Sequence, residues 1–133
     1  MEAVSVCPGE VVAVGTPFLK GLLNAGLEMK IVDARMGAED DGRRIPHARS
    51  LALDASEQEI ADIAGPPEGL VVLYEGGQKC ASSGKLAQRL TALGYRNVYL
   101  YRDGIDGWVR SGEVTEYEIN LANQLQMTEG TAA

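Results

Sequence analysis

The residues best suited to chemistry stand in the segment EGGQKCASSGK, which covers residues 75–85. Cys80 lies directly after Lys79 and about one helical turn before Lys85, where the pattern predicts the start of a helix. The positive end of a helix dipole and neighbouring lysines both stabilise a thiolate relative to a thiol. We therefore expect a nucleophilic Cys80. The alternative is a small apolar residue that packs at the helix start, as buried cysteines often do.

The backbone around this cysteine is also suited to an anion. The run GLVVLYE, residues 69–75, is continuously apolar until its last residue, which is typical of a central parallel strand. The N–H groups of Gly76, Gly77 and Gln78 follow it directly. In open α/β sheets ligands bind beyond the carboxyl ends of the strands, where such N–H groups converge on negative charge. We expect these amides, together with the two lysines, to hold an anion.

The remaining elements must position this turn. Apolar runs predict strands at 11–15, 27–33, 48–54, 69–75 and 97–101. Apolar residues at helical spacing predict helices at 17–26 and 80–93, and short helices are expected at 56–65 and 104–112. Thr16 is expected to cap the first helix, and Ser56 with Glu59 to form a capping box on the second. Strands that alternate with helices predict an α/β sandwich with a parallel sheet.

Length favours a single domain, because 133 residues suffice for one hydrophobic core. We place that domain at residues 1–113. Residues 114–133 are expected to form a tail that is partly helical or frayed, since Tyr117, Leu121 and Leu125 make only a modest helical stripe. The packing of this tail and the oligomeric state are left open by the pattern.

Charge and composition restrict the partners. A net charge of −7 and a pI near 4.7 disfavour nucleic acid and anionic membrane surfaces, so a small molecule or a protein is the expected partner. Two cysteines and one histidine do not match a zinc site, and no metal or other cofactor is expected. No apolar run is long enough to span a membrane, and the first residues lack a basic region followed by an apolar one, which predicts a cytoplasmic protein.

Several segments, in order, resemble the rhodanese family. They are IVDAR (31–35), GRRIPHARSL (42–51), VVLYEGGQKC (71–80), LGYRNVYLYRDGIDGW (93–108) and SGEV (111–114). The resemblance covers most of the chain, from about Gly15 to Gly112. It implies a rhodanese-like three-layer sandwich, with a mostly parallel central sheet of about five strands flanked by helices.

The resemblance also implies a site. In this family a cysteine after the central strand carries sulfane sulfur as a persulfide, and Glu75 occupies that position here. One branch has a longer loop, Cys-x4-Cys followed three residues on by serine, which EGGQKCASS matches with Glu75 at the first cysteine, Cys80 at the second and Ser83 at the serine. Ser83 is either a helix cap or a hydrogen-bond donor to a bound anion.

Other family positions imply supporting roles. Asp33 and Arg35 match residues that brace the active site, although a local turn with a surface ion pair is the alternative. His47 stands where the family has glycine and is expected at the surface. Asp103 replaces the first glycine of a pair, and Trp108 is expected in the core.

Two functions are therefore predicted. In the first, the chain is a sulfurtransferase that moves sulfur from thiosulfate or a persulfide through Cys80 to a thiol acceptor, so that its partners are a small sulfur anion or a persulfidated protein. In the second, it is a catalytically inactive module that binds a protein or a small anion. A phosphatase or arsenate reductase is disfavoured because the first arginine after Cys80 is Arg89, and a Cys7–Cys80 disulfide with a redox role is a further alternative.

Overall fold

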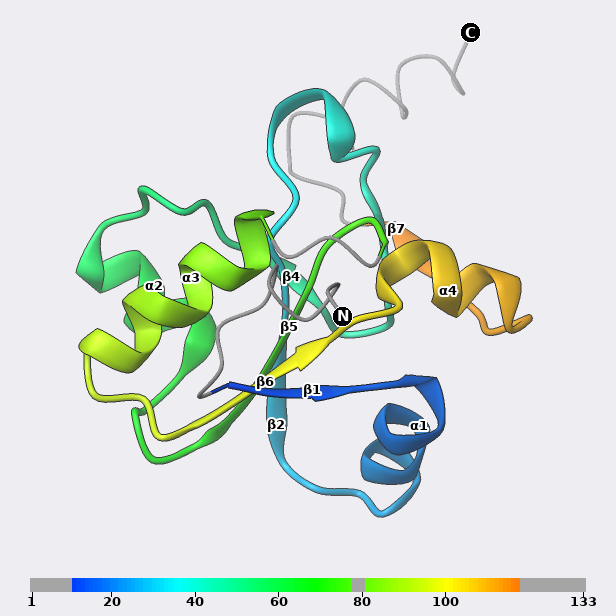
Figure 1. Ribbon diagram of the computed structural model, residues 1–133, viewed down its shortest axis with the longest axis horizontal. Coiled ribbons are helices and arrows are strands. Elements are labelled where there is room, and N and C mark those ends of the chain that lie inside the picture. Colours follow the sequence, from blue (N-terminus) through cyan, green and yellow to red (C-terminus); the bar gives the residue numbers. More distant parts are fainter. Residues whose placement is uncertain (1–10, 78–80, 118–133) are drawn as a thin grey trace, which may run out of the picture.

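Strands and helices alternate along the chain, as Figure 1 shows. The computed structural model describes residues 11–77 and 81–117. The elements in chain order are β1 (Val12–Val14), α1 (Thr16–Asn24), β2 (Met29–Asp33), the 3-10 helix η2 (Gly37–Glu39), β3 (Arg43–Arg44), β4 (Arg49–Ser50), α2 (Glu57–Ala64), β5 (Leu70–Tyr74), α3 (Ala81–Ala92), β6 (Asn97–Tyr101), α4 (Gly104–Arg110) and β7 (Glu116–Tyr117).

A parallel sheet of five strands forms the centre, in the order β1-β6-β5-β2-β4. Its strands β5 and β2 lie side by side, with Leu70 opposite Met29 and Tyr74 opposite Asp33. The α/β class, the parallel sheet and the flanking helices are thereby confirmed. A second, two-stranded sheet pairs β3 with β7 antiparallel.

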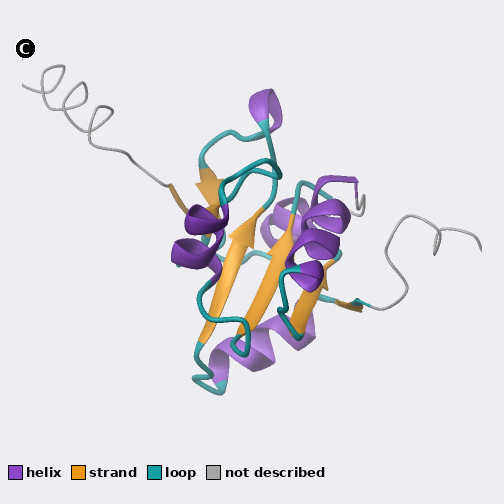
Figure 2. Cartoon of the chain, turned by 90° about the vertical axis from the view of Figure 1, so that its left-hand side faces the viewer, coloured by secondary structure: helices purple, strands orange, loops and turns teal. Residues whose placement is uncertain are grey.

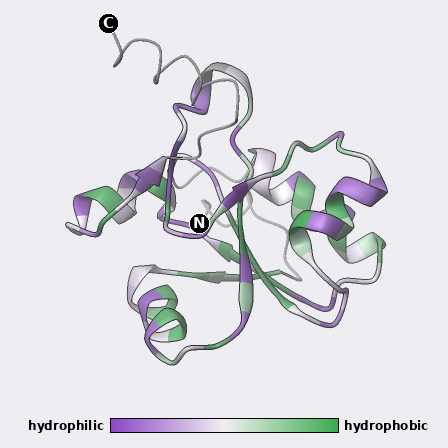
Figure 3. Cartoon of the chain, turned by 180° about the vertical axis from the view of Figure 1, so that it is seen from behind, coloured by the Kyte–Doolittle hydropathy of each residue, from purple (hydrophilic) through white to green (hydrophobic). Residues whose placement is uncertain are grey.

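Helices cover both faces of the sheet, which gives three layers (Figure 2). Successive side chains of a strand point to opposite faces, so Val71 and Leu73 join one core while Val72 and Tyr74 join the other. The first core contains buried residues of α2 and α3, and the second contains those of α1 and α4. Figure 3 shows apolar residues concentrated along the strands and hydrophilic ones in the loops.

Local signals explain where the helices begin. Ser56 accepts from the N–H of Glu59, and the Glu59 side chain accepts from the N–H of Ser56, so the predicted capping box is confirmed. The cap predicted for α1 was wrong. Gly15 is the N-cap, and Thr16 is the first helical residue. The N–H and the hydroxyl of Thr16 both donate to Asp103 in the loop after β6, so the Thr16 side chain bonds outside the helix and does not cap it.

The start of the predicted tail contributes to the fold. Tyr117, the first residue of the predicted helical stripe, lies in β7 opposite Arg43. An extended backbone there can pair with the N–H and C=O groups along the edge of β3, which a helix could not do. Leu121 and Leu125 lie outside the described residues, and the boundary at residue 113 stays a prediction. Among the helices of the described residues, none combines the length and the apolar character that crossing a bilayer requires.

Candidate functional site

The strand order brings two loops together at one edge of the sheet. From β2 the chain continues to the neighbouring strand β4, and from β5 it continues to β6 on the other side. The loops after β2 and β5 therefore diverge, and a crevice forms between them at the carboxyl ends of the strands. Asp33 ends β2 and Glu75 directly follows β5, so the two carboxylates lie at the carboxyl ends of adjacent strands.

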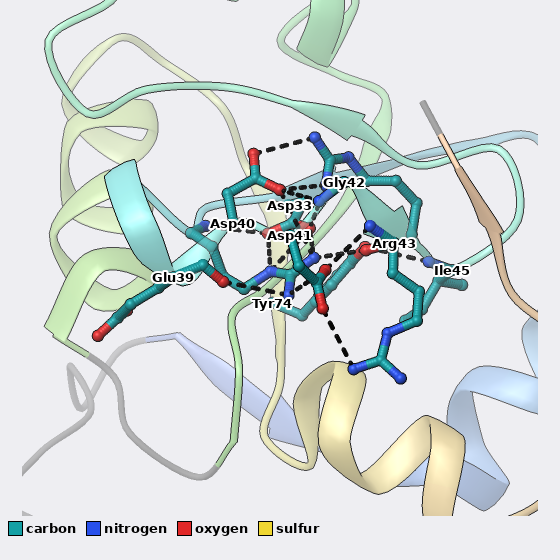
Figure 4. Close-up of polar contacts among 10 residues, drawn as sticks. Asp33, Glu39, Asp40, Asp41, Gly42, Arg43, Ile45 and Tyr74 are labelled. Atoms are coloured by element: carbon teal, nitrogen blue, oxygen red, sulfur yellow. Dashed lines mark hydrogen bonds and ion pairs between the residues drawn. The ribbon is translucent and has the colours of Figure 1, made fainter. Parts of the chain in front are cut away.

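An ion-pair cluster fills one side of this crevice (Figure 4). Asp33 is fully buried and accepts from Nε and Nη2 of Arg35, at 3.1 and 2.8 Å. Arg44 lies 3.3 Å from the same aspartate and binds Asp40 at 2.6 and 3.0 Å. Asp41 lies 3.2 Å from Nη1 of Arg35. We call these five residues the arginine cluster; it fixes the loop after β2 to the end of that strand.

Electrostatics keep Arg35 charged. Burial alone would lower the pKa of Arg35, but the hydrogen bond and charge of Asp33 and the charge of Asp41 raise it above its usual value. Burial raises the pKa of Tyr74, and the charge of Asp33 raises it further, so this hydroxyl stays protonated. The Tyr74 oxygen accepts from the N–H of Ile45 at 3.1 Å. The phenol thus anchors the loop that follows the arginine cluster.

Glu75 lies on the other side of the crevice and is buried, with 5% of its surface exposed. Its Oε1 accepts from the backbone N–H of Ser83 at 2.9 Å and from the Ser83 hydroxyl at 2.6 Å. Ser83 belongs to the first turn of α3, where backbone N–H groups have no partner within the helix. The carboxylate therefore supplies the acceptor that a bound anion would otherwise supply.

The start of α4 completes this side. The N–H groups of Ile105 and Asp106 donate to the carbonyls of Glu75 and Gly76, at 3.0 and 2.8 Å. Gly104, which begins α4, has a φ of +66°. These contacts hold the first residues after β5 against the helix.

A cavity of about 330 Å³ lies between the two sides. Within the described part of the chain, it is lined by Arg35, Glu39, Asp41, Arg43, Glu75, Gly76, Gly77 and Asp106. These residues come from the segment between β2 and β4, which includes η2 and β3, from the loop after β5 and from α4. The crevice that the strand order predicts is thus an open, charged pocket.

A family model described as the rhodanese-like domain matches residues 17–111 of the chain. The chain belongs to this family. Among curated proteins no match was found. The sequence resemblance to rhodaneses is therefore confirmed, whereas the Cys-x4-Cys loop stays a prediction.

Solved structures share the rhodanese-like fold. The BH2092 protein from Bacillus halodurans is 20% identical with a TM-score of 0.68, over 86% of this chain and 89% of that one. The polysulfide-sulfur transferase homodimer from Wolinella succinogenes is 16% identical with a TM-score of 0.67, over 90% and 88%. The thiosulfate sulfurtransferase from Pseudomonas aeruginosa is 24% identical with a TM-score of 0.66, over 83% of this chain, which spans about a fifth (21%) of that protein.

The rhodanese-like fold brings several sequence-predicted residues together. Glu75, Gly76, Gly77 and Arg35 line the cavity, and Asp33 holds Arg35 in place. Ser83 binds Glu75. Lys85 is exposed on α3 and is not part of the cavity lining. Gln78, Lys79 and Cys80 lie outside the described residues, as does Cys7, so their roles stay predictions.

Sequence reasoning missed four residues of the lining: Glu39, Asp41, Arg43 and Asp106. The first three belong to the charge-rich segment MGAEDDGRR, whose density of acidic and basic residues was the available signal. Asp106 had no such signal, because its position depends on how α4 packs against the loop after β5. His47 is exposed, as expected.

Metal binding finds no support in the described ranges 11–77 and 81–117. No group of three or more histidine, cysteine, aspartate or glutamate side chains there could hold a metal ion. What the arrangement offers chemically is a buried carboxylate at the end of β5 and a pocket rich in acidic groups.

Proposed function

We propose that this rhodanese-like domain is a binding module that does not transfer sulfur through the residue after β5. The observation that carries the proposal is the contact between Glu75 and Ser83. A carboxylate cannot form a persulfide. It also takes up the donors at the start of α3, which would otherwise stabilise a thiolate or a sulfur anion. The cavity beside it remains open to a ligand.

Sulfur transfer through Cys80 is the second candidate. In its favour, Cys80 directly precedes α3, and two of the structurally similar proteins are a thiosulfate sulfurtransferase and a polysulfide-sulfur transferase. In this reaction the Cys80 thiolate attacks the outer sulfur of thiosulfate. The sulfur–sulfur bond breaks, and sulfite leaves with the electron pair. An acceptor thiolate then removes the sulfur from the Cys80 persulfide.

Intact-mass spectrometry with a turnover assay separates the two functions. The reduced protein and its Cys7→Ser and Cys80→Ser variants are incubated with thiosulfate or polysulfide and then with a thiol or cyanide acceptor. If the domain is a binding module, we expect no catalytic sulfur transfer that depends on Cys80. A gain of ~32 Da that is passed to the acceptor and disappears only in Cys80→Ser would establish the second candidate instead.

A positive test of the binding function uses NMR of the isotope-labelled full chain. The amide signals of Gly76, Gly77 and Asp106 report on the cavity, because these residues line it. A ligand of the module must shift them in a saturable way. Ligands that shift only signals distant from the cavity would contradict a binding function at this site.

A further inference from the structure

The cavity beside Glu75 has an excess of acidic groups. Among the residues that the structure describes, its lining contains the four carboxylates of Glu39, Asp41, Glu75 and Asp106 and the two guanidinium groups of Arg35 and Arg43. A pocket with this balance repels a doubly charged anion such as thiosulfate and attracts a cation. The net charge that a ligand meets in the cavity depends on which of these side chains are already paired with other residues of the protein.

Arg35 has no donor left for a ligand. Its Nε and Nη2 donate to Asp33, its Nη1 donates to the Glu39 carbonyl and to Asp41, and Nη2 also donates to the carbonyl of Arg43. The side chain is almost fully buried. An anion could bind this guanidinium only by displacing acceptors that already satisfy it. Arg35 is therefore part of the scaffold of the cavity.

Arg43 contributes little net positive charge. Its Nη2 lies 3.4 Å from Oδ2 of Asp41, so an acidic group of the lining balances it. Its Nε has no hydrogen-bond partner within the described ranges, but this atom is buried. The two cations of the lining are thus paired with Asp33 and Asp41.

Three carboxylates of the lining have unused acceptors. Oε1 of Glu75 takes both bonds from Ser83, and Oε2 has no hydrogen-bond partner among the residues that the structure describes. This side chain is more than nine-tenths buried and lines the cavity, so its free oxygen can be satisfied there. The side chains of Glu39 and Asp106 also have no partner among those residues, and both are exposed.

These acceptors suit an organic cation. The described carboxylates do not converge closely enough for a metal ion. A guanidinium group is planar, is weakly hydrated and presents several N–H donors in a fixed fork that matches separate carboxylate oxygens. The cavity volume falls within the range of small-ligand pockets.

We propose that the cavity binds the guanidinium group of an arginine side chain on a partner protein, with Glu75 and Asp106 as its acceptors. This inference rests on the proposed binding function and names its partner class. The arginine enters between the loops after β2 and β5. Its positive charge balances the carboxylates of Glu75 and Asp106, because Arg35 and Arg43 are already paired with Asp33 and Asp41.

The test is an NMR titration of the labelled full chain with N-acetyl-arginine amide. The matched neutral ligand is the citrulline analogue, which has the same shape without the charge, and thiosulfate is the anionic comparison. We expect saturable shifts at Gly76, Gly77 and Asp106 with the arginine compound only. Equal binding of the citrulline compound, or tighter binding of thiosulfate, would overturn the proposal.

Variants locate the interaction. Glu75→Gln keeps an oxygen that can accept from Ser83 and replaces the free oxygen with an N–H donor, so the fold is retained while arginine binding weakens by about tenfold. Asp106→Asn should weaken it in the same direction. Glu68→Gln is the control: Glu68 precedes β5, at the opposite end of that strand from the cavity, and the variant should bind as the parent does. Equal loss in all three variants would indicate nonspecific attraction to an acidic protein and contradict the site.

A peptide arm distinguishes a protein partner from a free guanidinium compound. A short peptide with one central arginine between neutral residues should bind more tightly than N-acetyl-arginine amide, because neighbouring backbone also contacts the crevice. Equal affinity would exclude a protein partner and leave the small cation as the ligand. Sulfur transfer by Cys80 in the same samples would contradict the binding module independently of these titrations, whereas absent arginine binding without sulfur transfer would contradict only the present inference.

Discussion

The side-chain hydroxyl of Ser83 lies 2.6 Å from Oε1 of Glu75, and the backbone N–H of Ser83 lies 2.9 Å from the same oxygen. One buried carboxylate thus joins the end of β5 to the first turn of α3. The contact acts in the manner of a helix cap, although its acceptor comes from before the loop rather than from the residue preceding the helix. The donors of Ser83 at the start of α3 are thus occupied by the protein's own carboxylate, that of Glu75.

Ser83→Ala should therefore destabilise the fold. It removes a buried hydrogen bond to a charged group, which costs about 1.5–3 kcal/mol of the free energy of unfolding. Urea denaturation at neutral pH measures the loss. Ser82→Ala is the matched control, because Ser82 is only half-buried and has no hydrogen-bond partner in the described part of the chain. Similar losses in both variants would show that the contact with Glu75 contributes no stability.

Glu75→Cys should restore a persulfide-forming residue at the end of β5. In a chain that also carries Cys7→Ser and Cys80→Ser, residue 75 is the only thiol, and it lies beside the N–H and hydroxyl of Ser83 that now bind the carboxylate. We expect a gain of ~32 Da after incubation with polysulfide, read by intact-mass spectrometry. The same chain with Glu75→Ser should gain nothing. A folded Glu75→Cys protein without the added sulfur would indicate that the fold no longer presents this position to a donor.

Asp33→Asn should be among the most destabilising single substitutions. It removes the one fully buried carboxylate that both Arg35 and Arg44 contact, and leaves these two buried guanidinium groups with only the less buried Asp40 and Asp41. Removing one partner of a buried ion pair typically costs about 3–5 kcal/mol. Chemical denaturation gives the value. For comparison, Glu113→Gln breaks the more exposed pair with Lys20 and should cost at most about 1 kcal/mol; equal losses would mean that burial of the arginine cluster is irrelevant to its strength.

Stability should fall in acid through Asp40. Burial would raise its pKa, but the hydrogen bond from Arg44, the N–H of Gly42 and the charges of Arg44 and Arg35 together lower it below the ordinary value of 3.8. The folded state therefore holds this proton more weakly than the unfolded state. The stabilisation is fully present above the unfolded pKa and is lost as pH falls through the folded pKa.

The free energy of unfolding, measured between about pH 2 and pH 6, should thus fall less steeply for Asp40→Asn than for the parent protein. Asp41 also has a lowered pKa, because the N–H of Arg43 and the charges of Arg35 and Arg43 outweigh the effect of burial. Some acid dependence will therefore persist in the variant. Parallel curves for the two proteins would contradict the role of Asp40.

Much of the fold could be predicted from the sequence because its signals are local. The capping box of Ser56 and Glu59 and the continuous apolar run of β5 each predict one element without knowledge of the others. Trp108 was expected inside and is 3% exposed. Asp33 and Arg35 form a buried ion pair, which excludes the alternative of a surface ion pair, and their role in bracing the site stays a prediction.

What the sequence could not predict depends on contacts between distant segments. Ser83 could be read either as a cap or as an anion ligand, and its bond to Glu75 became apparent only when α3 was placed against β5. The pairing of β3 with β7 involves strands of two residues each, too short to show any periodicity. The acidic character of the cavity depends on Asp106, which α4 brings against the loop after β5.

The close packing of α4 against the loop after β5 depends on Gly104. A Cβ at this position would lie 2.3 Å from the carbonyl oxygen of Glu75 and 2.8 Å from the carbonyl carbon of Gly76, which are backbone atoms that cannot move aside alone. Without a Cβ, the N–H groups of Ile105 and Asp106 reach the carbonyls of residues 75 and 76. The positive φ adds a conformational cost for any other residue.

Gly104→Ala should consequently lower the free energy of unfolding by about 2–6 kcal/mol, from the strained φ together with the steric overlap. Gly112→Ala separates the two causes, because Gly112 also has a positive φ, of +81°, but has open space where the Cβ would be. That control should lose only about 1–2 kcal/mol. Urea denaturation of both variants decides the matter: equal losses would mean that the close packing of α4 on the loop after β5 does not limit residue 104, and the cavity wall formed by Asp106 would then have to be held in place by other contacts.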